Sequence, residues 1–313
     1  MLMINPFRYS NDNKRYHTLS YYNKSHGIAA YKAVLDAGFT CPNIDGTKGT
    51  GGCIFCSGGS GYFTAGPQMS IEEQLERELA CIRHKHPPAK AIAYFQAHTN
   101  TYSETSRLRE LYERALSVQG VCGLSIATRC DALEAETLDY LRELNTRTYL
   151  TVELGLQTIH DSTAEKINRC HTFSEFLQGY YELKRAGIRV CVHMINGLPG
   201  EDEEMMTESA TQVGRLRPDA VKLQLLHVIR GTPLEQMYLR GEYTPLSLED
   251  YINILVRQLE VLPPETVIER ITGDGKAGEL IAPLWSRDKL RVLGSIDKAL
   301  AERDTWQGKY YSQ

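Results

Sequence analysis

Short apolar runs and amphipathic segments alternate along most of this chain. The alternation is clearest after Ser70, where apolar residues recur three and four positions apart up to Pro87, as on one face of a helix. Ser70 and Glu73 form a capping-box sequence, which predicts that this helix begins there. The pattern also predicts strands at about 31–36, 91–95, 121–128, 149–156, 188–195 and 220–226, and helices at 104–118, 133–144, 173–186 and 201–216.

Strands and helices that alternate this regularly indicate parallel β/α units, and therefore an α/β fold. Six units are complete by residue 226. The periodicity by itself leaves a six-unit barrel, an eight-unit barrel and a doubly wound sheet as alternatives. Beyond residue 226 we predict a helix at 246–262, a strand at 267–271, a turn at 273–276 and a final helix at 286–303.

The composition is that of an ordinary soluble protein, with 42% hydrophobic and 24% charged residues. No apolar run approaches the ~18 residues of a membrane span, so we expect no membrane partner. Nothing directs export, so we expect a cytoplasmic location and reduced cysteines that are available to metal. The net charge of −4 argues against a protein that coats nucleic acid, although a local basic patch stays compatible with it.

Basic and aromatic residues are concentrated near the N-terminus. Residues 1–40 contain five basic residues, two acidic residues and five interleaved tyrosines. This mixture suits contacts with phosphates and stacked bases, and it also suits an arm that packs across the fold with half-buried tyrosines. The basic residues are Arg8, Lys14, Arg15, Lys24 and Lys32, and the tyrosines are Tyr9, Tyr16, Tyr21, Tyr22 and Tyr31.

Three of the eight cysteines, Cys41, Cys53 and Cys56, lie within sixteen residues of a glycine-rich loop. Thiolates at such spacing bind zinc, iron–sulfur clusters or copper. Structural zinc takes four protein ligands, usually as two pairs, whereas this loop offers one Cys-x-x-Cys pair and a third cysteine. Three thiolates on a four-iron cluster would leave one iron open to a small molecule, which fits the loop better. A structural zinc site stays the alternative.

Polar residues gather just after four of the predicted strands, where parallel β/α folds carry their chemistry. Taken alone, Glu153 could be an ordinary ion-pair partner, and His193 could be an ordinary hydrogen-bonded core histidine. The four groups are Gln96–Asn100, Thr128–Asp131, Glu153–Thr158 and His193–Gly200.

The cysteine loop, in which Cys53 and Cys56 frame the aromatic Phe55, resembles the cluster loop of radical S-adenosylmethionine (SAM) enzymes. The gap of eleven residues after Cys41 is longer than the commonest gap in that superfamily, and it resembles the branch of the Elongator catalytic subunit. The segment Asp36–Asn43 resembles the small bacterial members of this branch.

Two further motifs carry the resemblance. Glu153-x-Gly155-x-Gln157 resembles the signature after the fourth strand of Elongator-like and coproporphyrinogen-oxidase-like enzymes, and Asn196–Gly200 resembles the glycine-leucine-proline-glycine turn after the fifth. The resemblance implies a partial (β/α)6 radical SAM barrel. We accordingly predict an N-terminal arm at 1–30, the barrel at 31–230 and a C-terminal extension at 231–313 that closes its open side.

The resemblance implies two cofactors, a [4Fe–4S] cluster held by Cys41, Cys53 and Cys56 and S-adenosyl-L-methionine on its fourth iron. It also implies an electron donor such as flavodoxin or ferredoxin. Reductive cleavage of SAM would give a 5′-deoxyadenosyl radical that abstracts hydrogen from the substrate. The sequence identifies no catalytic residue for that step.

The resemblance further implies a set of residues around SAM. Gln157 would lie against the ribose with His193 near it, and Arg169 would bind the carboxylate, which a guanidinium can grip through two hydrogen bonds. Two positions depart from the family pattern, because no Gly-Gly-Glu motif follows the second strand and many relatives carry a glutamate near the end of the third. The predicted set is Gln96, Arg129, Glu153, Gln157, Arg169 and His193.

For the substrate, the resemblance implies the wobble uridine of tRNA, at its 5-position side chain. Because the chain shows no acetyltransferase domain, we expect it to remodel an existing side chain, for example carboxymethylaminomethyl to aminomethyl. An enzyme acting on a small molecule or tetrapyrrole and a non-enzymatic zinc- or haem-binding protein are the alternatives. The five other cysteines are expected to be packing residues, with the roles of Cys130 and Cys170 left open.

Overall fold

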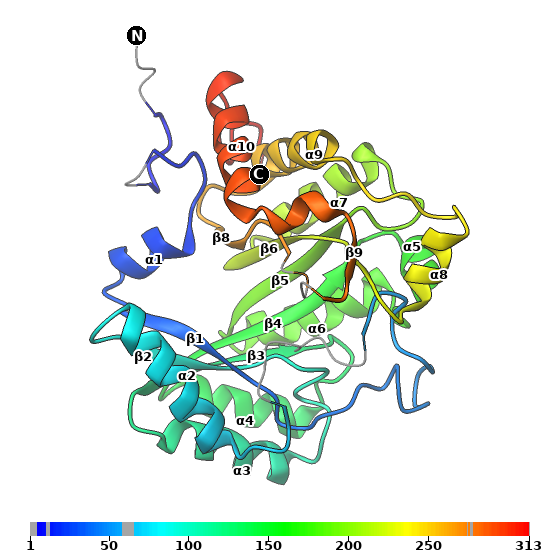
Figure 1. Cartoon of the computed structure of the whole chain (residues 1–313). Helices are drawn as coiled ribbons and strands as arrows, with labels where there is room; N and C mark the ends of the chain where they lie inside the picture. Colours follow the sequence, from blue (N-terminus) through cyan, green and yellow to red (C-terminus); the bar gives the residue numbers. More distant parts are fainter. Residues whose placement is uncertain (1–4, 11–12, 58–65, 274, 276–277, 313) are drawn as a thin grey trace.

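The computed structural model describes residues 5–10, 13–57, 66–273, 275 and 278–312. A seven-stranded parallel sheet forms its centre, in the order β1-β2-β3-β4-β5-β6-β8 (Figure 1). The strands are β1 (Ala30–Leu35), β2 (Lys90–Phe95), β3 (Val121–Thr128), β4 (Tyr149–Gln157), β5 (Arg189–Asn196), β6 (Ala220–Leu225) and β8 (Val267–Arg270).

Helices join the strands and cover the sheet. For example, α2 (Ile71–Lys85) packs on β1 and β2, α3 (Thr105–Ser117) on β3, and α6 (Phe173–Arg185) on β4 and β5. The strands are apolar along most of their length, as parallel strands covered by helices require. The other helices are α1 (Leu19–Ser25), α4 (Ala135–Asn145), α5 (Asp161–Lys166), α7 (Glu203–Leu216), α8 (Pro233–Leu239), α9 (Leu248–Val261), the short 3-10 helix η1 (Leu284–Arg287) and α10 (Lys289–Glu302).

The predicted α/β fold, a partial parallel barrel, is confirmed, and β8 adds a seventh strand to its six units. Strand β8 pairs in parallel with β6, so the sheet continues past the six units that the periodicity shows. Lys32 of β1 and Glu269 of β8 form an ion pair of 2.5 Å, which joins the two edge strands across the open side. The predicted boundaries of arm, barrel and extension stay predictions.

The elements that the sequence pattern missed are all short. Helices α1, α5 and α8 and the antiparallel pair β7 (Val228–Ile229) and β9 (Leu280–Ala282) contain seven residues or fewer each. Two turns of helix are too few to show a period in the sequence. In contrast, α2 begins as predicted, with the reciprocal hydrogen bonds of a capping box between Ser70 and Glu73. The predicted turn at 273–276 lies partly outside the described residues.

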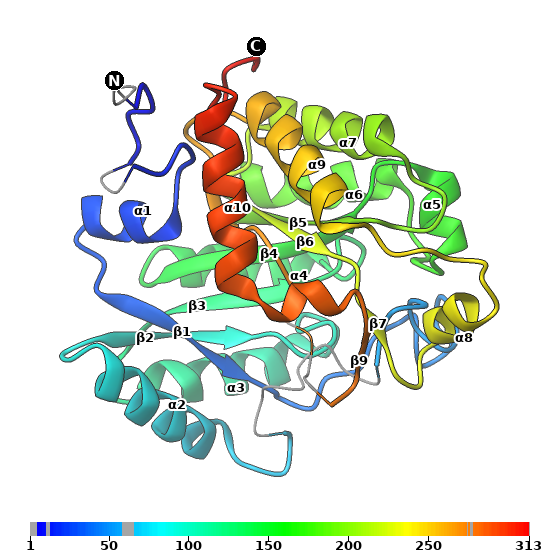
Figure 2. The same cartoon turned by 45° about the horizontal axis from the view of Figure 1, so that its top comes forward.

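The N-terminal arm lies against the C-terminal extension (Figure 2). Arg15 pairs with Asp304 at 3.0 Å, Lys14 pairs with Asp297, and Tyr16 is buried. These contacts favour the interpretation of a packed arm over that of a free nucleic-acid-binding arm. No described helix combines the length and apolar character that a membrane crossing requires.

Candidate cluster and cofactor site

A cavity of about 300 Å³ lies at the C-terminal ends of strands β2 to β6. The structure places all nine predicted site residues on its wall, although they come from six separate segments of the chain. Parallel strands bring their C-terminal ends to one edge of the sheet, which explains this convergence. The nine residues are Cys41, Cys53, Cys56, Gln96, Arg129, Glu153, Gln157, Arg169 and His193.

The cysteine loop, residues 41–56, is folded by its own backbone. The Gly52 N–H donates to the Asn43 carbonyl at 2.8 Å, and the Cys56 N–H donates to the Cys53 carbonyl at 2.9 Å. These turns fold the long gap back on itself. Cys41 therefore reaches the same cavity wall as the Cys-x-x-Cys pair.

The spacing of the three thiols can be compared with the spacing that a zinc ion imposes on its ligands. Around a tetrahedral zinc ion the sulfur atoms lie ~3.8 Å apart, as follows from a Zn–S bond of about 2.3 Å. In the described parts of the chain, the one group of at least three His, Cys, Asp or Glu ligand atoms within 4.8 Å of one another is Glu153, Cys191 and His193. The three loop thiols therefore do not all lie within 4.8 Å of one another in the metal-free structure, a spacing with which a larger, multi-iron group is compatible.

The structure explains why the Glu-x-Gly-x-Gln signature has a glycine at position 155. A Cβ atom at this position would lie 2.8 Å from Arg169 Nη2 and 3.0 Å from Gln157 Nε2. Without that atom both side chains can cross β4 at the cavity wall, and Arg169 Nη2 donates a hydrogen bond to the Gly155 carbonyl. Gln157 follows a bulge in the pairing of β4 with β5 and has a φ of 75°, which turns it away from the regular strand.

Two polar atoms on this wall, Gln157 Oε1 and Arg169 Nε, are buried and lack a hydrogen-bond partner among the described residues. Arg169 is only 7% exposed, so water does little to compensate. A buried polar group without a partner costs about 1–3 kcal/mol, which a bound polar ligand can recover. The two atoms therefore fit a ligand that carries both a carboxylate and hydroxyl groups. Their contacts with SAM stay predictions.

Arg129 is committed to neighbouring protein groups. Its guanidinium makes two hydrogen bonds of 2.8 Å with Asp131, and it donates to the backbone carbonyls of Arg169 and Cys170 at 2.9 and 3.1 Å. Its predicted contact with SAM, like that of Gln96 at the end of β2, stays a prediction. Cys130 is buried, and burial raises the pKa of its thiol to about 12.

A layer of polar side chains, which we call the floor, has Glu153 at its centre and lines the cavity through Tyr94, Glu153, His193 and Lys222. Glu153 is fully buried and accepts hydrogen bonds from five side chains. Lys32 Nζ lies at 2.6 Å, Tyr94 Oη at 2.9 Å and His193 Nε2 at 2.6 Å. Each strand of the sheet contributes one member of this floor: Lys32, Tyr94, Ser125, Glu153, His193, Lys222 and Glu269.

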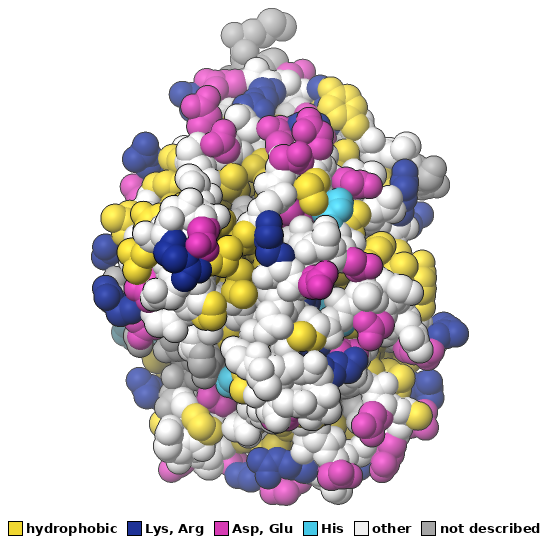
Figure 3. Space-filling view, turned by 90° about the vertical axis from the view of Figure 1, so that its right-hand side faces the viewer, with side chains coloured by type: hydrophobic (Ala, Val, Ile, Leu, Met, Phe, Trp, Pro, Cys, Tyr) yellow, Lys and Arg dark blue, Asp and Glu magenta, His cyan; other side chains and the backbone are white. Residues whose placement is uncertain are grey.

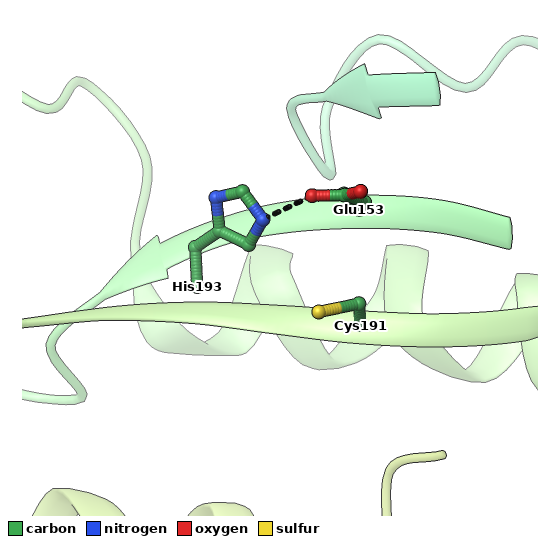
Figure 4. Close-up of side chains that lie close together, drawn as sticks. All are labelled: Glu153, Cys191 and His193. Atoms are coloured by element: carbon green, nitrogen blue, oxygen red, sulfur yellow. Dashed lines mark hydrogen bonds and ion pairs between the residues drawn. The ribbon is translucent and has the colours of Figure 1, made fainter. Parts of the chain in front are cut away.

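The floor fixes the charge states of its members. Burial alone would raise the pKa of Glu153, but the ammonium groups of Lys222 and Lys32 outweigh burial and hold the pKa well below 4.5. Burial and Lys222 lower the pKa of His193 to about 4. At neutral pH His193 is therefore uncharged, donates its Nε2–H to the Glu153 carboxylate and keeps the lone pair on Nδ1. Figure 4 shows Nδ1 pointing away from Glu153.

Glu153, Cys191 and His193 have the spacing of a metal site but not its chemistry (Figure 4). Two lysines already neutralise Glu153. Burial raises the pKa of the Cys191 thiol well above its ordinary 9.0, whereas a metal ligand must be a thiolate. We assign this group to the ion-paired floor.

Most of the floor was not predicted from the sequence. Lys32, Tyr94, Ser125 and Lys222 stand inside largely apolar strands, where each looks like an isolated exception. Lysine is almost never buried unless it is paired, so Lys222 within the run Ala220–Leu225 was the signal that could have revealed a buried ion cluster.

Two family models match the chain. The Radical SAM superfamily model matches residues 44–213, and the Radical_SAM C-terminal domain model matches residues 218–302. This chain belongs to the radical SAM superfamily. The predicted cofactors, a [4Fe–4S] cluster and SAM, are those that this superfamily uses, and the loop thiols, Gln157 and Arg169 fit them.

This chain is similar to several known proteins. It is 47% identical over 315 residues to the uncharacterized protein YtqA of Bacillus subtilis (strain 168), covering 100% of this chain and 98% of YtqA. It is 36% identical over 155 residues to the tRNA uridine(34) acetyltransferase of Methanocaldococcus jannaschii, covering 47% of this chain and 29% of that protein. Its fold is similar to archaeal Elp3 from Methanocaldococcus infernus, with a TM-score of 0.68, 18% identity, and coverage of 90% of this chain and 64% of that one.

Replacing Arg169 by alanine is expected to weaken SAM binding more than replacing Gln157 does. A hydrogen-bonded charged contact contributes about 1.5–3 kcal/mol, which is roughly a 10- to 100-fold change in Kd, against about 1 kcal/mol for a neutral hydrogen bond. Anaerobic equilibrium dialysis of SAM against the cluster-loaded proteins measures both. Arg142→Ala, an exposed arginine on α4, is the control. Native SAM affinity and equal iron content in both variants would show that the register after β4 is misassigned.

Proposed function

We propose that this protein is a radical SAM enzyme that modifies the side chain at the 5-position of the tRNA wobble uridine. The observation that carries the proposal is the sequence similarity to a tRNA uridine(34) acetyltransferase over 47% of this chain. That similarity covers 29% of the relative, so its acetyl transfer is not carried over. We propose instead the remodelling of an existing side chain, carboxymethylaminomethyl to aminomethyl.

The cavity supports this choice of side chain. The carboxymethylaminomethyl group carries an amine and a carboxylate close together, and beside the ion-paired floor the cavity wall carries one cationic and one anionic side chain, Arg270 and Glu279. The conversion to aminomethyl breaks the bond between the amine nitrogen and the carboxymethyl carbon and is a two-electron oxidation. SAM, when bound beside the reduced cluster, would supply the radical that removes a hydrogen atom from that carbon. The oxidised cluster would accept the second electron, and water would release the fragment as glyoxylate. The protein's part is to hold the side chain over the floor and to exclude water from the radical. A flavodoxin or ferredoxin as electron donor belongs to the same proposal.

The face of the molecule in Figure 3 shows no continuous basic patch among the side chains coloured there. Lysines and arginines are scattered among acidic residues on this face. Phosphate contacts would therefore come from single side chains. Binding of tRNA should weaken with salt, but less steeply than for a protein with a strongly basic groove, because fewer counterions are released.

The proposal predicts a change in the wobble nucleosides of cells that lack this gene. Carboxymethylaminomethyluridine is expected to accumulate there, and the aminomethyl form and its derivatives to disappear, as measured by nucleoside mass spectrometry of purified tRNA. The reconstituted enzyme with SAM and a reductant should convert tRNA that carries the carboxymethylaminomethyl group. The same tRNA with unmodified uridine is the matched control and should remain unchanged.

An unchanged nucleoside profile, together with no binding of tRNA at low salt in the presence of SAM, would contradict the tRNA proposal. SAM cleavage by the same preparation would then direct the search to a small molecule or tetrapyrrole. The superfamily assignment would be unaffected, because it rests on the family match and the cysteine loop.

A further inference from the structure

Four consecutive backbone carbonyls after α5 accept hydrogen bonds from outside their own segment. They belong to residues 167–170, which we call the 167–170 turn. The first two accept from the cysteine loop, through the Ile54 N–H at 3.1 Å and the Asn43 side-chain amide. The last two accept from Arg129, at 2.9 and 3.1 Å. The backbone on both sides of Arg169 is thus held from two directions.

The 167–170 turn needs such support. Asn168 and Cys170 both adopt left-handed backbone conformations, with φ of 55° and 57°. A residue with a side chain pays about 1–2 kcal/mol for this region, so the conformation persists only where surrounding contacts impose it. The turn presents Arg169 to the cavity wall.

A chain of charged groups connects this turn to the cysteine loop a second time. Lys48, inside the eleven-residue gap, lies 2.8 Å from Asp131, and Asp131 binds Arg129 through two hydrogen bonds. Burial alone would raise the pKa of Asp131, but Arg129 and Lys48 outweigh it and hold the pKa well below 3.8. Asp131 therefore stays charged and keeps Arg129 aimed at the turn.

The gap also touches the turn directly. The Asn168 side-chain amide donates to the carbonyls of Thr50 and Gly52 at 3.1 and 2.8 Å. Gly49 lies so close that a Cβ atom there would be 2.7 Å from the Cys170 sulfur. Apart from the hydrogen bond of the Ile54 N–H, these contacts use residues between Cys41 and Cys53, which a shorter cysteine spacing would remove.

We propose that the eleven-residue gap acts as a brace that fixes Arg169 relative to the three cluster cysteines, with Asp131 as the positioning residue at its centre. A ligand that must reach both the cluster and Arg169 binds tightly only if their separation is correct. The inference rests on the placement of SAM in the cavity. It does not depend on the substrate, so it would survive failure of the tRNA proposal.

Asp131→Asn tests the brace in the cluster-loaded protein. Without this charge, Arg129 should no longer be held in the orientation in which it donates to the 167–170 turn. The Kd for SAM should then rise on the order of 10-fold, as is common when a residue that orients a ligand-binding group is lost. Iron content should stay native. The SAM-induced change in the EPR spectrum of the reduced cluster should need correspondingly more SAM. Lys48→Met should raise the Kd roughly two- to fivefold, because this lysine is 35% exposed, and Lys48→Arg should restore it.

Asp219→Asn is the matched control, because it breaks a partly buried lysine–aspartate pair with Lys184 that has no part in the cavity wall. It should leave the Kd for SAM unchanged. Native SAM affinity in Asp131→Asn, or an equal loss in Asp219→Asn, would overturn the inference. If Asp131→Asn loses its cluster, Lys48→Met decides: weaker SAM binding at full iron content supports the brace, and native binding overturns it.

Discussion

Alanine at Cys41, Cys53 or Cys56 is expected to abolish the iron–sulfur cluster, and reductive cleavage of SAM with it. In the predicted cluster the three thiols are the protein ligands, so removing one would leave a second iron without a protein ligand. Native protein reconstituted without oxygen should hold about four iron atoms per chain, and each variant close to none. Iron and sulfide analysis after gel filtration measures the difference.

Cys81→Ala is the control for this experiment. Cys81 is exposed on α2 and lies outside the cavity wall, so this variant should keep the full iron content. The cluster assignment would be refuted by one tightly held zinc ion per native chain, with iron never retained under strict anaerobiosis.

Replacing Glu153 by glutamine is expected to destabilise the fold strongly. The exchange removes the carboxylate that pairs with the buried ammonium groups of both Lys32 and Lys222. Only the ion pair of Lys32 with Glu269 then remains among these three pairs. Removing one partner of a buried ion pair costs about 3–5 kcal/mol in the free energy of unfolding. Urea unfolding of the native and variant proteins at pH 7.5 measures this loss.

Glu265→Gln provides the control, because Glu265 forms an exposed ion pair with Arg8. Its cost should stay below about 1 kcal/mol. The stability that Glu153 contributes to the native protein should also decrease at low pH. Because folding lowers the pKa of Glu153, its contribution is complete above the ordinary value of 4.5 and declines as the pH falls below it. A Glu153→Gln protein as stable as native at pH 7.5 would show that the ion-paired floor contributes nothing to the fold.

The sequence by itself determined the class of fold, and its resemblance to a known family indicated the chemistry. Apolar periodicity sets the strands and helices of a parallel β/α protein, because each covered strand must be apolar and each helix must bury one face. Three cysteines with no fourth ligand nearby indicate a cluster with an open iron, because the number of potential ligands in the loop can be counted in the sequence. Through the family resemblance, the motifs after β4 and β5 then predict which residues lie around SAM.

Only the tertiary structure decided what these polar residues contact. Glu153 was predicted beside SAM, yet five side chains from the other strands surround its carboxylate, and none of them is near it in the sequence. Arg129 likewise points at the 167–170 turn, forty residues away along the chain. The pattern of apolar and polar positions records which way a side chain faces but not which side chain it meets. Partners across a sheet depend on strand order and register, and these are set by the packing of the whole fold.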